Sequence, residues 1–240
     1  MPEPTTGAAG EGDPPGAARR FEPDLRGMTR INLRPIASPM PLGFYTVAIG
    51  SVIVGCFQLG VFEDGARRAV GLTILPAFVL QLLVAVLAFG ARDVVAATLM
   101  ACFSGLWLAT SLTLVTDPPD GIRVLGVLNA VFAVFALLMA SVAGRKRALW
   151  LVLGTAVPRF AVAAVANLTG ADWAGVLSGL LGLLLAVVAL YTAFALMLED
   201  MRGEQVLPIG RSGPAHHAVE GDLSVQLRDL ERQAGVRRTL

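Results

Sequence analysis

The sequence predicts an all-α protein that crosses a membrane with six helices. Hydrophobic residues make up 55% of the 240 residues and charged residues only 15%, which is outside the usual range of soluble domains. The hydrophobic residues gather in six runs, at residues 42–62, 70–90, 94–115, 124–143, 149–168 and 173–198. Each run holds about 20 residues or more, enough to cross a hydrocarbon core of ~30 Å at ~1.5 Å per residue. Only helices and closed barrels satisfy the backbone polar groups in lipid, so six such runs indicate a polytopic membrane protein.

The chain divides into three parts by composition. Residues 1–37 are rich in Pro, Gly, Ala and charged residues, so this N-terminal tail is expected to be disordered. Residues 38–200 form the six-helix transmembrane domain. Residues 201–240 are polar again, and leucines at helical spacing after Asp222 favour a short amphipathic helix there.

The first helix is predicted to begin at the stretch Ser38-Pro39-Met40-Pro41-Leu42-Gly43-Phe44. Pro39 and Pro41 prevent a regular helix before this point, because proline has no backbone N–H and favours extended geometry in the residue before it. Pro41 suits the first turn of a helix, where its missing donor would have had no partner. Gly43 is expected to let another backbone approach closely.

Turn-forming and charged residues separate the later helices. A second helix follows the first after an acidic and basic loop, and the third follows after a tight turn. The fourth follows a proline-containing turn, the fifth a basic loop and the sixth a short hairpin. These breaks fall at residues 63–68, 90–93, 117–121, 144–147 and 169–172.

Lysine and arginine predict the orientation of the helices. One set of loops and tails is rich in these residues and the alternate set is poorer, and the richer set belongs in the cytoplasm. Both termini are therefore predicted to be cytoplasmic, in a protein of the plasma (cytoplasmic) membrane. The richer set holds Arg26, Arg30, Arg34, Arg92, Arg145, Lys146, Arg147, Arg202 and Arg211, and the poorer set holds Arg67, Arg68 and Arg123.

Several functions are disfavoured by the sequence. A net charge of +1 argues against a nucleic-acid partner. Cys56 and Cys102 lie inside apolar runs, where a free thiol behaves as a small apolar residue. The two histidines, His216 and His217, have no further ligand nearby, so no metal site is expected. The chain has no phosphate-binding loop, no dinucleotide fingerprint and no H-E-x-x-H motif, so we expect neither an enzyme nor a cofactor.

Arg159 is the residue most indicative of function. It lies halfway along the fifth helix, about 15 Å from either end by helix rise, and a central arginine costs at least ~2.5–3.5 kcal/mol on insertion scales. Pro158 frees a backbone carbonyl at the same depth, as in the broken helices of transporters. Arg159 then either serves a substrate pathway or pairs structurally with backbone or a neighbouring protomer. The uncharged polar residues Gln81, Asn129 and Asn167 either line the same pathway or join helices.

The Pro-x-Pro-Leu-Gly stretch at residues 39–43 resembles the signature of the acetate/succinate transporter family of bacteria and fungi. Ser38 stands where that family has Asn. A second match, Val206-Leu207-Pro208-Ile209-Gly210, follows the sixth helix. Further matches are Leu125-Gly126-Val127, Trp107, Gln81 and Asn167, and the resemblance covers roughly residues 38–210.

The resemblance implies a central path through each protomer and a ring of six subunits. It implies that Gln81 faces the path and that Val47, Phe103 and Ala156 pinch it. Two of these three are smaller than the family's residues, and the family has apolar residues where Pro158 and Arg159 stand. The implied function is transport of small carboxylates, acetate-like first and succinate-like second, by a channel or a proton-linked carrier. The alternatives are a channel for a neutral solute such as urea or an amide, and a membrane scaffold that transports nothing.

Overall fold

The computed structural model describes residues 37–143, 147–202 and 206–208, and over these residues the protein is helical. Six helices are long and apolar enough to cross a membrane, as the sequence predicts. The predicted disordered tail up to residue 36, the basic loop 144–146 and the predicted C-terminal helix lie outside the described residues. The elements are α2 (Met40–Gln58), the 3₁₀ turn η1 (Asp64–Ala66), α3 (Arg67–Gly90), α4 (Val94–Thr116), α5 (Gly121–Ala143), α6 (Arg147–Thr169) and α7 (Asp172–Arg202).

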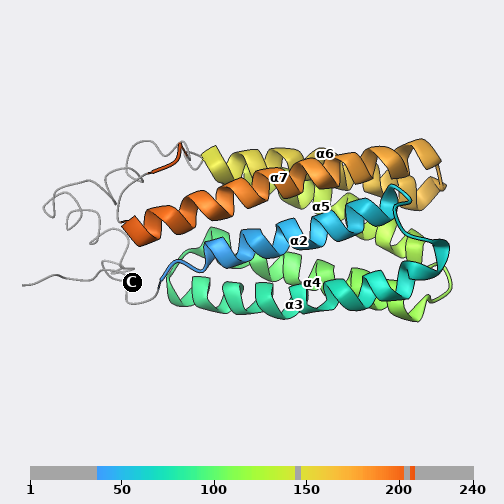
Figure 1. The fold of residues 1–240 in the computed structure, drawn as a ribbon, viewed down its shortest axis with the longest axis horizontal. Coiled ribbons are helices and arrows are strands. Elements are labelled where there is room, and N and C mark those ends of the chain that lie inside the picture. Colours follow the sequence, from blue (N-terminus) through green and yellow to red (C-terminus); the bar gives the residue numbers. More distant parts are fainter. Residues whose placement is uncertain (1–36, 144–146, 203–205, 209–240) are drawn as a thin grey trace, which may run out of the picture. The chain divides into compact units, whose positions relative to one another are not determined.

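The six long helices form a closed ring. Each helix packs against the next in the chain, and α2 packs against α7, which closes the ring between the first and last of them. Figure 1 shows this pairing as the blue helix beside the orange one. Large apolar side chains remain exposed on every long helix of the ring, as expected where lipid rather than water covers the outside.

The proline stretch begins α2 as predicted. The helix starts at Met40, directly after Pro39, and Pro41 lies in its first turn. Gly43 is closely packed, since a Cβ there would lie 2.8 Å from the sulfur of Met100 and 3.2 Å from a methyl group of Val84. The neighbours that need this glycine are therefore side chains of α3 and α4, and not a backbone as expected.

Two glycines allow α2 and α7 to pack closely. A Cβ on Gly55 would lie 3.1 Å from the carbonyl oxygen of Gly179, and a Cβ on Gly179 would lie 3.0 Å from that of Gly55. Small residues of this kind let membrane helices approach each other. Gly55 and Gly179 thus act inside the protomer, whereas a Cβ on Gly175 would meet nothing within 4 Å.

Helix α3 is held to α4 by hydroxyl groups. Ser111 donates a hydrogen bond of 2.7 Å to the carbonyl oxygen of Gly71, and Ser104 donates one of 2.9 Å to that of Phe78. Both serines are buried. Such bonds between membrane helices contribute about 0.6 kcal/mol each on average, so they fix the rotation of α3 more than they stabilise the fold.

Helix α7 is longer than a membrane span requires. Its 31 residues extend about 46 Å, against a hydrocarbon core of ~30 Å. The sequence predicts its end near residue 198, and the structure continues it to Arg202. The segment that follows returns along the helix, since the hydroxyl of Tyr191 donates a hydrogen bond of 3.3 Å to the carbonyl oxygen of Pro208. The second motif noted in the sequence therefore contacts α7.

Candidate functional site

A cavity of about 110 Å³ lies inside the ring, and we call it the chamber. Residues of α2, α4, α5, α6 and α7 line it, and no described residue of α3 does. The lining residues recur every three or four positions, as one face of a helix requires. The stripe on α2 is Val47, Ser51, Val54 and Gln58, and the stripe on α4 is Phe103, Leu106, Trp107, Thr110 and Leu114.

Arg159 supplies the charge of the chamber. Its side chain is 7% exposed, and in the described part of the chain none of the hydrogen bonds or ion pairs involves it. Its guanidinium carbon lies 5.3 Å from the ring centre of Phe160. This cation–π contact offsets only part of the free energy that burying the charge costs. A carboxylate in the chamber would supply the missing counter-charge.

The side chain of Arg159 packs against α7. A Cβ on Gly182 of α7 would lie 3.6 Å from Arg159 Nε, an ordinary van der Waals distance. Helix α6 runs without a break from Arg147 to Thr169 through Pro158. The opening predicted from this proline is thus confined to one backbone hydrogen bond, the one that the Gly154 carbonyl oxygen would otherwise accept.

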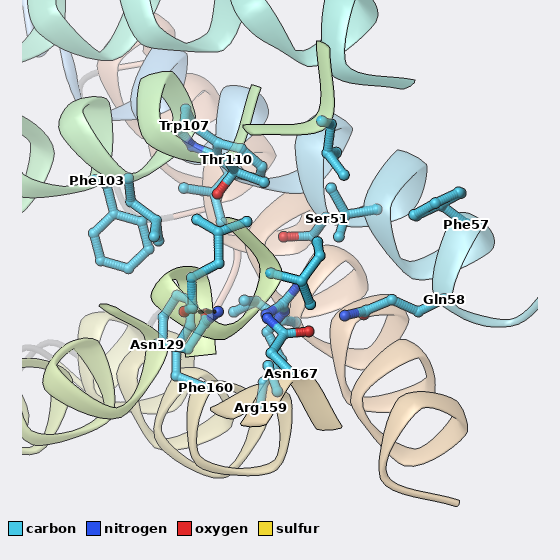
Figure 2. A pocket seen from close by; sticks show the side chains of 18 residues that line it. Ser51, Phe57, Gln58, Phe103, Trp107, Thr110, Asn129, Arg159, Phe160 and Asn167 are labelled. Carbon is cyan, nitrogen blue, oxygen red and sulfur yellow. Dashed lines mark hydrogen bonds between the residues drawn. The ribbon is translucent and has the colours of Figure 1, made fainter. Parts of the chain in front are cut away.

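Gln58 presents a donor to the same region. The buried hydroxyl of Ser178 donates a hydrogen bond of 3.2 Å to Gln58 Oε1, which leaves the Nε2 end of the amide for the chamber. Figure 2 shows the side chain of Gln58 extending toward Arg159 and Asn167. Donors from α2 and α6 therefore converge, as an anion site requires.

Aromatic rings close the chamber at the end away from Gln58. The rings of Phe103, Phe132 and Phe160 lie 5.7 to 5.8 Å apart, centre to centre, a separation typical of edge-to-face contacts. Val47 and Phe103, two of the three residues predicted to pinch the path, line the chamber. Ala156 is 1% exposed and lies in the same apolar core, but does not line the chamber. Phe160, one helical turn along α6, lines it instead.

A second cavity of about 490 Å³ adjoins the chamber, and we call it the vestibule. Its walls come from the start of α3 and from the α4–α5 and α6–α7 connections. Arg67 and Asp117 form an ion pair of 2.9 Å there, and Arg123 and Asp120 one of 3.6 Å. The two cavities share Ile122 and Asn167 as lining residues, so they lie next to each other.

Some of the predicted pathway residues line the chamber in the structure and one does not. Arg159, Asn129 and Asn167 line the chamber, although Asn129 donates its amide N–H to the Leu125 carbonyl oxygen at 2.8 Å. Gln81 is fully buried between helices, and its amide lies 3.4 Å from the carbonyl oxygen of Gly43. Gln81 thus joins α3 to α2, and its place in a pathway stays a prediction, as does the pinch at Ala156.

Sequence reasoning missed several residues of the chamber. Neither Gln58 nor Ser51 is among the residues that the sequence predicts for the pathway. Their common face with Val47, at spacings of four and eleven residues, was the signal that could have identified them. Phe160 was missed because Ala156 was the one position of the fifth helix that the resemblance assigned to the pinch. Further residues missed include Thr110 and the apolar wall residues Val54, Leu106 and Leu185.

Comparisons with known proteins agree with this architecture. The chain is 27% identical over 186 residues to the succinate-acetate/proton symporter SatP of Escherichia coli K12 and, to the same extent, to that of Shigella flexneri. These alignments cover 74% of this chain and 97% of the relatives. The solved structure of the bacterial acetate channel SatP superimposes with a TM-score of 0.66 and 26% identity, over 73% of this chain and 99% of that one. Residues 18–208 match the GPR1/FUN34/yaaH family, and this chain belongs to it.

Proposed function

We propose that this protein carries small carboxylates across the membrane, with acetate as the reference substrate. The observation that carries the proposal is the buried guanidinium of Arg159, which faces a chamber with no carboxylate among its described lining residues. The relatives named for succinate, acetate and protons give the substrate class its support. An intramembrane cation without a protein partner is expected to have a ligand as its partner.

The route runs from the vestibule past Asn167 to the chamber, and then between the aromatic rings. Asn167 lines both cavities, so an anion that leaves the vestibule meets its amide before it meets Arg159. Val47, Phe103 and Ala156 form the pinch in this proposal, with Phe160 as a fourth apolar member packed 5.7 Å from Phe103. Dewetting of such an apolar constriction is a known way to control flow through a pore.

Both termini are cytoplasmic in this proposal, because the lysine- and arginine-rich loops lie at the end where α2 begins and α7 ends. The vestibule then opens to the outside. By the family resemblance the protein assembles as a homo-hexamer in which each protomer has its own path. Each path acts either as a channel or as a proton-linked carrier.

Flux into liposomes tests the proposal. The purified protein is reconstituted, and uptake of labelled acetate, succinate and urea is measured beside protein-free vesicles. Acetate flux well above that of the empty vesicles is expected. Urea flux without acetate flux would instead assign a channel for neutral solutes, and an absence of flux for all three would assign a scaffold.

A further inference from the structure

The chamber holds one fixed charge. Among the described residues that line it, Arg159 alone is ionisable at neutral pH, and arginine stays protonated. The other polar lining groups are amides, hydroxyls and an indole. One cation in a chamber of about 110 Å³ can neutralise one carboxylate.

The vestibule offers no second unpaired cation within its described walls. Its two arginines, Arg67 and Arg123, face the two aspartates Asp117 and Asp120 at 2.9 Å and 3.6 Å. The four charges cancel. A ligand that carries two negative charges would therefore meet a single unmatched positive charge between the vestibule and the aromatic rings.

The wall away from Gln58 carries no charge. In Figure 2 Phe103 lies on that side together with Thr110 and Asn129, whose side chains are polar but uncharged. The ring of Phe160 lies beside the guanidinium itself, at 5.3 Å. A chain that extends from a carboxylate bound at Arg159 meets apolar side chains and uncharged polar groups, and no second cation among the described lining residues. This lining suits a short aliphatic chain better than a second carboxylate.

We propose, on the basis of the proposed function, that this chamber selects monocarboxylates with a short aliphatic tail and rejects dicarboxylate dianions. The carboxylate binds Arg159 with help from the Gln58 amide, and the tail lies against Phe103 and Phe160. A second carboxylate would lose its water without gaining a cation or a sufficient set of donors, and an ionised group in that position is strongly disfavoured.

Four labelled substrates separate charge from size in proteoliposomes at neutral pH: acetate, butyrate, succinate and monomethyl succinate. Monomethyl succinate keeps the succinate skeleton and carries one charge. Acetate, butyrate and monomethyl succinate are expected to enter, and succinate about tenfold or more slowly, because only the dianion leaves a charge unpaired. Succinate flux equal to that of monomethyl succinate would overturn the proposal. Exclusion of both would show that size selects, which also overturns it.

A gain-of-function variant tests the same idea in the other direction. Thr110 lines the chamber on α4, so Thr110→Lys adds a second cation, and Thr110→Met is its neutral control of similar length. The ratio of succinate to acetate flux should rise about tenfold in the lysine variant and stay unchanged in the methionine variant. An unchanged ratio in an assembled Thr110→Lys protein contradicts the proposal, and the substrate panel decides alone if that variant does not assemble. Absence of acetate flux would refute the proposed function, whereas equal acetate and succinate flux would refute only this selectivity.

Discussion

Replacement of Arg159 by glutamine removes the charge of the chamber and keeps a polar side chain of moderate length. Because no described group of the protein neutralises this guanidinium, its main electrostatic partner in the proposed mechanism is the substrate. The variant should therefore lose anion flux while neutral solutes of the size of urea are little affected. Arg159→Lys is the matched control, since it restores the charge in a different geometry.

The size of the loss follows from the burial of the site. At an effective dielectric constant of about 20, unit charges ~4 Å apart attract each other by ~4 kcal/mol. Desolvation offsets much of this, and hydrogen bonds to charged groups contribute about 1.5–3 kcal/mol net. The apparent affinity for acetate should thus fall by roughly 10- to 150-fold in Arg159→Gln, and Arg159→Lys should recover part of it.

The stability of a variant without Arg159 provides a second measurement. The proposed role predicts that stability rises, whereas a structural role predicts that it falls. A central arginine costs at least ~2.5–3.5 kcal/mol on insertion scales, so removing one without a partner should stabilise the protein. We expect Arg159→Leu to raise the free energy of unfolding in detergent by up to about 3 kcal/mol while acetate flux falls. The concentration dependence of acetate uptake and a thermal melt, measured on the same preparations, check both parts.

A structural role for Arg159 would reverse this pattern. If the guanidinium stabilises the fold through backbone carbonyls or a neighbouring protomer, Arg159→Leu should melt at a lower temperature and acetate and urea flux should fall together. Equal loss of both fluxes in an assembled protein would refute the assignment of Arg159 as an anion site. Retained acetate affinity in Arg159→Gln would do so as well.

Three further predictions concern the path and its orientation. Ala156→Phe should overpack the proposed pinch at a cost of about 1–3 kcal/mol in folding stability and slow acetate flux, with assembly unchanged; normal flux would place the pinch elsewhere. Gly50→Ala should displace the indole of Trp107, because the new Cβ would clash with that ring, and a loss of thermal stability with slower flux would show it. Cysteine placed at Thr169 should react with an impermeant label from outside and cysteine at Lys146 should not, and the opposite pattern would invert the topology.

The helices could be predicted from the sequence because lipid imposes a simple requirement. A segment that crosses hydrocarbon must be apolar and long, so its composition alone identifies it. The ends of the helices were also readable, since Pro39 and Pro41 mark where α2 begins. The excess length of α7 was not readable, because its last turn carries charged residues that composition assigns to a loop, and a helix can continue into water.

The chamber could be predicted only in part. Arg159 was evident because a charge in lipid is rare, and Asn167 came from the family resemblance. Gln58 was not evident, since its role depends on a hydrogen bond from Ser178 that joins residues 120 positions apart. Gln81 is the opposite case. Its position in the sequence suggested that it lines the path, but its observed contact joins α3 to α2.

The composition of the chamber wall also bears on how a proton could accompany the substrate. The described lining residues include no carboxylate and no histidine, so a proton relay through side chains lacks its usual members at this depth. A guanidinium favours the ionised form of a bound acid over the neutral form, because it attracts the carboxylate and gains nothing from the acid. A substrate should therefore reach Arg159 as the carboxylate, having given its proton to water before it enters the chamber. Coupled movement then requires that the proton be exchanged outside the chamber, toward the ends of the helices where the acidic residues Glu63, Asp172 and Glu199 lie.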